Sequence, residues 1–321
     1  MEPADVKCVA VIGAGTMGAG IAGEFARAGC RVRLLDMSPE LLARGMKLAE
    51  SAQGALVKAG LISAKGSAAA LKRIGTTTVL EEACDGVQLL VEAIAENLLL
   101  KRQMFHRFDA CCPNGAVLVS NTSGLSIGKM AAVTRRPELV AGMHFWNPPH
   151  LIPLVEVTQG KDTAKRTVDL LMGVCRRMGK RPILVRHDVP GFVANRLQFA
   201  VLREALHLLE EGIATAQDID AAMTAGPGLR YALLGPLRTA DLGGLDVFAA
   251  ISSYLFPTLS AARRPPGSLE RLVRQGKLGT KTGAGFYRYP KGERERIFAV
   301  RDAVLPGFLK VLRENGGIER L

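Results

Sequence analysis

The 321-residue sequence predicts an α/β fold, in which a doubly wound parallel sheet is followed by an all-α helical domain. Short apolar runs alternate with helical patterns between residues 6 and 185, and a glycine-rich turn directly follows the first run. From Pro190 onward nearly every strand pattern is lost, while helical periodicity continues. We therefore expect a sheet domain over residues 1–187, a helical domain over 188–293 and a charged C-terminal tail over 294–321.

Seven apolar runs are the predicted strands of the sheet. They cover residues 6–12, 31–35, 88–93, 117–120, 139–143, 154–157 and 182–185. After the second run, Ser38 and Pro39 predict the start of a long helix, because Ser is a favoured N-cap and Pro a favoured first helical residue. Another helical piece is expected over residues 65–73. Strands that alternate with helices in this way are typical of a parallel sheet covered on both faces.

The second half of the chain has a helical pattern. One long helix is predicted over residues 190–211, with Gly212 as its stop. Further helices are expected over residues 217–224, 239–260 and 269–275, and the tail after Lys291 is compatible with another. A helical bundle is the predicted architecture of this domain.

Composition excludes several classes of function. The formal net charge of +12 favours anionic ligands, but the Lys and Arg residues are scattered and lack interleaved aromatic residues, which disfavours a nucleic-acid interface. No apolar run approaches the roughly 18–20 residues that span a bilayer, and no secretory signal is visible at the N-terminus. The six cysteines form no C-x-x-C pair and no zinc-ligand spacing, so we expect no metal site and a cytoplasmic protein with reduced thiols.

The glycine-rich turn, Gly13-Ala14-Gly15-Thr16-Met17-Gly18, lies between a predicted strand and a predicted helix. In that setting Gly13 makes the tight turn, Gly15 lets the backbone approach a pyrophosphate, and Gly18 packs helix against strand. The first N–H groups of the helix, those of Thr16 and Met17 among them, would then face phosphate oxygens. The alternative is an ordinary α/β turn without a ligand.

Asp36 follows the second predicted strand and indicates which dinucleotide would bind. A carboxylate there accepts hydrogen bonds from a ribose 2′-hydroxyl and repels a 2′-phosphate. Met37 follows it, rather than an Arg. The sequence therefore predicts NAD as the cofactor in preference to NADP.

His144 and Glu156 are the candidates for proton transfer. His144 follows the apolar run 139–143, and Glu156 is the one acid within the run 154–157. A carboxylate in such a run is costly to bury without a partner, and a histidine stabilised by a carboxylate can move a proton near neutral pH. The alternative is a buried structural ion pair.

Several further motifs accompany these residues. They are Val91-Glu92-Ala93 with Glu96-Asn97, Ser120-Asn121-Thr122-Ser123, Pro190-Gly191-Phe192-Val193 with Asn195-Arg196, and Lys281-Thr282-Gly283 with Gly285-Phe286-Tyr287. Together with the glycine turn and the His144–Glu156 block, they resemble the L-3-hydroxyacyl-CoA dehydrogenase family over nearly the whole chain. The resemblance implies a Rossmann-type NAD-binding domain, a helical substrate and dimerisation domain, a homodimer and a place in fatty acid metabolism.

The resemblance also implies residue roles. His144 would take the hydroxyl proton as hydride leaves for NAD, and would act as general acid in reverse, while Glu156 orients its ring. Ser123 and Asn195 would hydrogen-bond the reacting oxygen of the substrate. Both Ser123 and His144 follow predicted strands, so they are expected at the carboxyl edge of the sheet, where open α/β folds bind ligands. The alternatives are an ordinary turn serine and a capping or packing amide.

Contacts to NAD are implied for four more residues. They are Glu96, Lys101, Asn147 and Lys281. A lysine-based β-hydroxyacid dehydrogenase would share the glycine turn, but would place a catalytic Lys where this chain has Asn195-Arg196.

The sequence departs from the family pattern at positions that bear on the substrate. The stretch 54–61, where short-chain acyl-CoA members often carry lysines for CoA phosphates, is mostly apolar here. The family's His-Phe-Phe-Asn-Pro has Trp146 at its third position. The stretch 228–231 is more similar to that of relatives that oxidise small free acids, such as L-gulonate 3-dehydrogenase with its λ-crystallin kin and a pyridine-carboxylate dehydrogenase.

These departures leave the substrate open. The leading expectation is a short L-3-hydroxyacyl-CoA, and the alternative is a free hydroxy acid or a hydroxymethyl aromatic carboxylate, which Arg230 could hold by two parallel hydrogen bonds. The alternative is that Arg230 is a surface or salt-bridged residue. A non-catalytic NAD-binding structural protein is the alternative from another class, and the four intact residues Ser123, His144, Glu156 and Asn195 argue against it.

Overall fold

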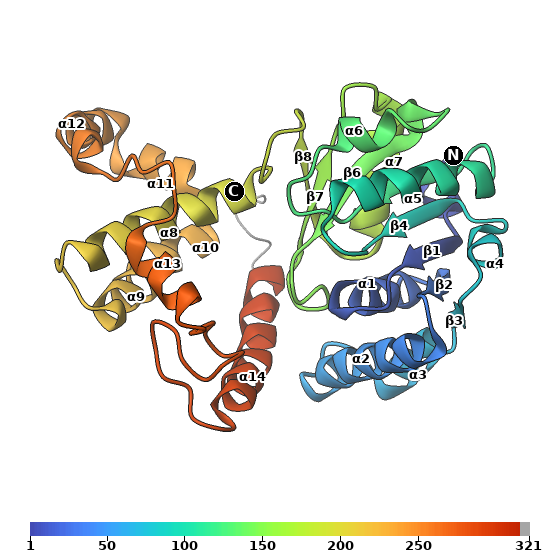
Figure 1. Ribbon diagram of the computed structural model, residues 1–321, viewed down its shortest axis with the longest axis horizontal. Helices are drawn as coiled ribbons and strands as arrows, with labels where there is room; N and C mark the ends of the chain where they lie inside the picture. Colours follow the sequence, from blue (N-terminus) through green and yellow to red (C-terminus); the bar gives the residue numbers. More distant parts are fainter. Residues whose placement is uncertain (315–321) are drawn as a thin grey trace. The chain divides into compact units, whose positions relative to one another are not determined.

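The computed structural model describes residues 1–314, so the last residues of the predicted tail, 315–321, lie outside the described part. The chain divides into two compact units, one over Met1–Asn195 and one that begins at Arg196 (Figure 1). The first unit holds a sheet with helices on both faces, and the described part of the second is built mainly of helices. The predicted fold class is therefore confirmed.

The first unit is built on an eight-stranded sheet. Its strands are β1 (Cys8–Ile12), β2 (Arg31–Leu35), β3 (Ile74–Thr77), β4 (Leu89–Glu92), β5 (Val117–Ser120), β6 (Val140–Phe145), β7 (Leu154–Thr158) and β8 (Arg181–Val185). The spatial order is β3-β2-β1-β4-β5-β6-β7-β8. The order reverses beside β1, and in open α/β sheets ligands bind at such a switch point, outside the carboxyl ends of the strands. Strand β3 was missed, because Gly75, Thr76 and Thr77 give it no apolar run.

The prediction of an all-parallel sheet is wrong for the last two strands. Strand β7 pairs with β6 antiparallel, and β8 pairs with β7 parallel. Only residues 146–153 connect β6 to β7, and a parallel crossover needs a dozen or more residues. The short connection therefore forces the chain to reverse.

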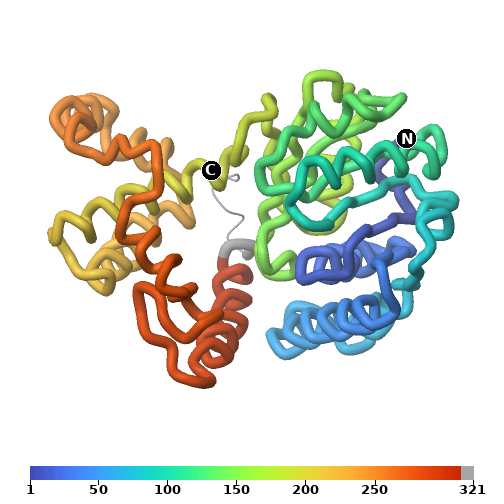
Figure 2. Tube along the Cα trace, viewed as in Figure 1, coloured from blue at the N-terminus to red at the C-terminus, as the bar shows by residue number. Residues whose placement is uncertain are grey.

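Helices cover both faces of this sheet. They are α1 (Thr16–Arg27), α2 (Pro39–Lys58), α3 (Ala64–Leu71), α4 (Leu80–Cys84), α5 (Leu98–Cys111), α6 (Ile127–Ala131) and α7 (Lys165–Arg177), with 3-10 turns η1 (Pro3–Asp5) and η2 (Pro137–Leu139). Helices α1 and α7 pack on one face, where α2 and α3 pack in turn on α1 (blue in Figure 2). Helices α4, α5 and α6 pack on the other.

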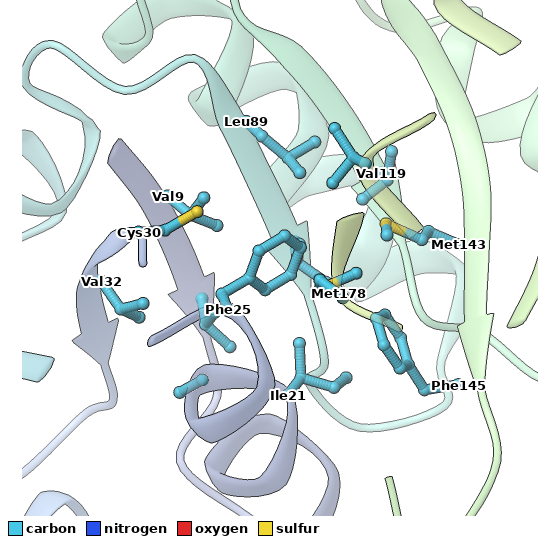
Figure 3. Close-up of a cluster of buried hydrophobic side chains, with 14 of the residues drawn as sticks. Val9, Ile21, Phe25, Cys30, Val32, Leu89, Val119, Met143, Phe145 and Met178 are labelled. Atoms are coloured by element: carbon cyan, nitrogen blue, oxygen red, sulfur yellow. The ribbon is translucent and has the colours of Figure 1, made fainter. Parts of the chain in front are cut away.

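Strand residues alternate between these two cores. Val9 and Val11 of β1 pack toward α1, whereas Ala10 and Ile12 pack toward α4 and α5. Figure 3 shows the first core, with Phe25 of α1 at its centre, and the rings of Phe25 and Phe145 lie edge to face with their centroids 6.4 Å apart. Full burial of such a side chain stabilises the fold by about 1.5–3 kcal/mol, so this layer fixes α1 against the sheet.

The second unit is helical. Its elements are α8 (Ala194–Glu210), which begins at the end of the first unit, α9 (Ala216–Ala225), α10 (Pro227–Leu233), α11 (Gly235–Gly243), α12 (Leu245–Leu255), η3 (Phe256–Thr258), α13 (Gly267–Arg274) and α14 (Glu293–Glu314). In residues 1–314, no helix combines the length and apolar character needed to cross a bilayer.

Two predicted helices differ from the structure. The helix predicted over 190–211 begins only at Ala194, because Gly191 and Phe192 have positive φ values of 76° and 48°. The helix predicted over 239–260 is divided at Gly244, whose φ is 90°. A residue with positive φ cannot continue a right-handed helix, so each glycine marks a boundary that apolar periodicity does not report.

Candidate active site

His144 and Glu156 form a buried pair on neighbouring strands. They lie directly opposite each other in the antiparallel β6–β7 register, and His144 Nδ1 lies 2.8 Å from Glu156 Oε2. Their exposed fractions are 5% and 0%. Because side chains alternate along a strand, both project from the sheet face opposite α1 and α7. The fold thus brings together the two residues singled out for proton transfer.

The Glu156 carboxylate accepts four hydrogen bonds. Oε2 receives His144 Nδ1 and, at 3.2 Å, the indole N–H of Trp146. Oε1 receives the backbone N–H groups of Val193 and Ala194 at 3.0 and 2.9 Å. Burial alone would raise the pKa of Glu156, but the donors from His144, Ala194, Trp146 and Val193 outweigh it and hold that pKa below its ordinary value. Glu156 is therefore ionised at neutral pH.

This carboxylate determines the tautomer of the histidine. An ionised carboxylate only accepts hydrogen bonds, so Nδ1 of His144 carries a proton, and in the neutral imidazole the lone pair is therefore on Nε2. The ring is further packed by Trp146 and Phe192, whose ring centroids lie 5.6 and 5.9 Å away. An imidazole held in this way can take a proton at Nε2 while the carboxylate stabilises the charge that forms.

Ser123 and Asn195 lie together in the first unit. Asn195 Nδ2 donates to the backbone carbonyl of Ser123 at 3.1 Å. The backbone next to Ser123 also lies close to the backbone that precedes Asn195, since a Cβ on Gly124 would lie 2.7 Å from the backbone N of Gly191. Ser123 is exposed and Asn195 half-buried, so both keep accessible surface.

Glu96 and Lys101 belong to a network beneath Ser123. Glu96 Oε1 accepts from Thr122 Oγ1 at 2.5 Å and from the Ser123 N–H at 3.0 Å, and its Oε2 lies 3.4 Å from Lys101 Nζ. Lys101 is only 1% exposed, which leaves it almost no surface to offer a ligand. Its Nζ lies 2.5 Å from Glu92 Oε1.

Glu92 is a buried site residue to which the sequence reasoning gave no role. It is fully buried, and Ser120 Oγ donates to its Oε2 at 2.5 Å. The signal was present in the sequence, because Glu92 is a lone acid in the apolar run 88–93 just as Glu156 is in the run 154–157.

The glycine turn has the geometry of a dinucleotide cradle. Gly13 has a φ of 102°, and a Cβ there would lie 2.7 Å from the carbonyl oxygen of Ala93. A Cβ on Gly18 would lie 1.7 Å from the Gly13 carbonyl oxygen, whereas one on Gly15 would meet no atom within 4 Å. Gly13 and Gly18 are thus required by packing, and Gly15 leaves open space where a ligand can approach the backbone.

The start of α1 completes this cradle. Its N-cap is Gly15, so the N–H groups of Thr16, Met17 and Gly18 have no acceptor within the helix. Asp36 holds the turn from the next strand, where Oδ2 accepts the Ala14 N–H at 2.6 Å. Free N–H groups at a helix start attract phosphates, so these residues fit NAD.

Three further residues lie outside this network. Asn147 is exposed in the connection between β6 and β7. Arg230 on α10 and Lys281 are exposed in the second unit. No group of three or more His, Cys, Asp or Glu side chains within residues 1–314 is arranged to hold a metal ion.

Two family models match the chain. The NAD-binding domain of 3-hydroxyacyl-CoA dehydrogenase matches residues 8–189, and the C-terminal domain of 3-hydroxyacyl-CoA dehydrogenase matches residues 191–289. The two matches together cover most of the sequence.

Individual relatives extend this similarity. The chain is 41% identical to L-carnitine dehydrogenase of Streptomyces griseus subsp. griseus, over 99% of this chain and 92% of the relative. It is 39% identical to a "Probable 3-hydroxybutyryl-CoA dehydrogenase" of Bacillus subtilis, over 89% of this chain and 98% of the relative. It is 33% identical to 5-formyl-3-hydroxy-2-methylpyridine 4-carboxylate 5-dehydrogenase of Mesorhizobium japonicum, over 96% of this chain and 98% of the relative. A crystal structure of a 5-dehydrogenase for this pyridine carboxylate matches with a TM-score of 0.89, over 96% of this chain and 99% of that one.

Proposed function

Because the chain belongs to the 3-hydroxyacyl-CoA dehydrogenase family of NAD-dependent enzymes, we propose that it oxidises the alcohol of a 3-hydroxyacyl group or a similar hydroxy acid. The observation that carries this proposal is the buried pair of His144 and Glu156, with Nδ1 and Oε2 only 2.8 Å apart. A purely structural NAD-binding protein has no need of an imidazole with its tautomer held and its Nε2 lone pair kept.

The residues divide the work as follows. NAD, when bound at the glycine turn, supplies the acceptor for the hydride that leaves the alcohol carbon. Nε2 of His144 takes the hydroxyl proton, and Glu156 stabilises the imidazolium. In the reverse direction the same nitrogen returns the proton. Ser123 and Asn195 hydrogen-bond the reacting oxygen and so hold the alcohol near the imidazole.

Further residues bind the cofactor in this proposal. The N–H groups at the start of α1 hold the pyrophosphate, and Asp36 binds the ribose. Glu96, Asn147 and Lys281 contribute additional contacts. Lys101 acts through Glu96, because its own ammonium group is buried against Glu92.

The first candidate substrate is a short L-3-hydroxyacyl-CoA. The family, 3-hydroxyacyl-CoA dehydrogenase, and the Bacillus subtilis relative support it. The reaction would place the enzyme in fatty acid metabolism. The mostly apolar stretch 54–61 offers few positive charges for CoA phosphates.

The second candidate is a free hydroxy acid or hydroxymethyl aromatic carboxylate. The relatives named for L-carnitine and for a pyridine carboxylate match 99% and 96% of this chain, and neither name includes CoA. Arg230 is exposed and could hold the substrate carboxylate.

One experiment tests the reaction and separates the candidates. NADH formation at 340 nm is followed with 3-hydroxybutyryl-to-3-hydroxyhexanoyl-CoA thioesters, L-carnitine and free hydroxy acids, each with the parent protein and His144→Gln. Turnover of at least one substrate that is lost in His144→Gln supports the proposal, and no turnover of any substrate contradicts it. Arg230→Ala should impair the free acids only, and equal losses on both substrate classes would remove its carboxylate role.

A homodimer is also proposed. Helices α8, α11 and α12 expose many large apolar side chains, which are unusual on the surface of a monomer. They include Leu197, Phe199, Leu237, Leu242, Leu245 and Tyr254, and Leu237 is 82% exposed. Light scattering after size exclusion should give twice the mass of one chain, and Leu237→Lys with Leu242→Lys should give the monomer.

A further inference from the structure

Trp146 shares an acceptor with the proposed general base. It is the single Trp of the sequence and lies one residue beyond β6. Its indole N–H donates to Glu156 Oε2 at 3.2 Å, and the same oxygen accepts His144 Nδ1 at 2.8 Å. Oε2 of Glu156 therefore accepts hydrogen bonds from two side chains.

This sharing has a consequence for the histidine. Each hydrogen bond that a carboxylate accepts disperses its negative charge and makes it a weaker acceptor for any other donor. The imidazolium form of His144 depends on Oε2 for its stabilisation, more than the neutral form does. A second donor on Oε2 thus disfavours the imidazolium.

We propose that Trp146 is a positioning residue that tunes the catalytic proton transfer, because its N–H lowers the proton affinity of His144 Nε2 through Glu156. The inference rests on the proposed function, in which Nε2 takes the substrate proton. It assigns to Trp146 a role that a ring without an N–H cannot fill.

The other groups around the pair do not offer the same adjustment. The backbone N–H groups of Val193 and Ala194 bind Oε1 and are fixed by the chain. Ile183 of β8 faces Glu156 in the register, and Phe192 packs on the His144 ring. None of these groups is ionisable. His150 lies in the same connection as Trp146 and has an ionisable ring, so it needs its own control.

Two replacements separate the N–H from the ring. Trp146→Phe removes the donor and shortens the ring. Growth of a Trp auxotroph on β-(3-benzothienyl)alanine replaces only position 146, because the chain has one Trp, and it preserves the ring's size while removing the N–H. The profile of kcat/KM against pH is measured in the oxidation direction, which requires neutral His144.

We expect both replacements to move the acidic limb of that profile upward by about half a pH unit, with the same shift in a His150→Gln background. In a Glu156→Gln background, both shifts should become much smaller, because the carboxylate charge through which Trp146 acts on His144 is gone. A shift with Phe but none with the benzothienyl analogue would overturn the proposal, since packing would then be its cause.

A second readout does not depend on turnover. Imidazole NMR of the protein without NAD follows the protonation of His144, whose signal is identified by its loss in His144→Gln. Its midpoint should rise in both Trp146 replacements by the same amount as the kinetic limb. The proposed role of Trp146 is wrong if His144→Gln abolishes activity but the two Trp146 replacements move neither the NMR midpoint nor the acidic limb. If His144→Gln retains full activity, the proposed function itself fails.

Discussion

Lys101 and Glu92 form an ion pair inside the first unit, with Nζ and Oε1 2.5 Å apart and side chains 1% and 0% exposed. The pair joins the start of α5 to the end of β4. Glu92 also accepts from Ser120 at the end of β5. Glu92 therefore holds together the ends of β4 and β5, which lead to the site residues Glu96 and Ser123.

Lys101→Met should destabilise the protein by about 3–5 kcal/mol, because it leaves Glu92 buried without its cation. Urea unfolding followed by circular dichroism measures the loss. Lys165→Met is the matched control, since the Lys165–Asp169 pair is largely exposed and its loss should cost less than about 1 kcal/mol. Similar losses in both variants would mean that burial of the Lys101–Glu92 pair does not determine its contribution.

His144→Gln should lower kcat/KM by about 10²–10⁴-fold, which is the range for a lost general base. The Tm should change far less, because the substitution keeps a side chain that can donate to Glu156. The exposed His106 provides the control, and His106→Gln should keep its activity. A loss of activity in both variants would point to a general effect on folding.

Gly15→Ala and Gly18→Ala should affect different properties, NAD affinity in the first and stability in the second. Alanine at 15 fits into open space, so we expect an unchanged Tm and a Kd for NAD at least about tenfold weaker, or 1.4 kcal/mol. Alanine at 18 would collide with the Gly13 carbonyl, so the Tm should fall by about 10 °C or the protein should not fold. Unimpaired NAD binding by Gly15→Ala would show that the cofactor does not approach this turn.

Asp36→Ser should shift the cofactor preference. It removes the carboxylate that would repel a 2′-phosphate, so kcat/KM with NADP should rise relative to NAD by about tenfold or more. Initial rates with both cofactors give this ratio. A ratio equal to the parent's would mean that Asp36 does not recognise the ribose and serves only as acceptor for the backbone N–H groups of Ala14 and Met37.

Glu156 makes stability depend on pH. The pKa of Glu156 in the folded protein is below its ordinary value. The ionised carboxylate therefore adds fully to the free energy of unfolding above the ordinary glutamate pKa of about 4.3, and this contribution is lost as pH falls through the lower pKa of the folded protein. Glu156→Gln should be less stable at pH 7, but should lose less stability than the parent between pH 5 and pH 3. Parallel stability curves from urea unfolding would contradict this assignment.

The sequence predicted the parts of the fold that depend on local pattern. Apolar runs located seven strands within two residues of their observed ends, and the glycine turn located the start of α1. The apolar runs do not report the direction of a strand. Strand β7 runs antiparallel to β6 because the connection between them is short, and a run of residues within one strand cannot show this. Strand β3 has no apolar run and is defined by its pairing with β2.

The site follows the same division. A lone acid in an apolar run indicated Glu156, and the same signal was present but unused at Glu92. The partners of Lys101 could not be read from the sequence, because Glu92 and Glu96 reach it through the turn from β4 to α5. The roles of Ser123, Asn195 and Arg230 remain predictions.

The antiparallel register of β6 and β7 determines whether His144 and Glu156 meet. A slip of one residue would turn Glu156 toward α1 and put Val155 or Val157 opposite His144. The same slip would shift β7 against β8 and turn Val155 and Val157 out of their core, so the apolar alternation of β7 is also what keeps Glu156 beside His144.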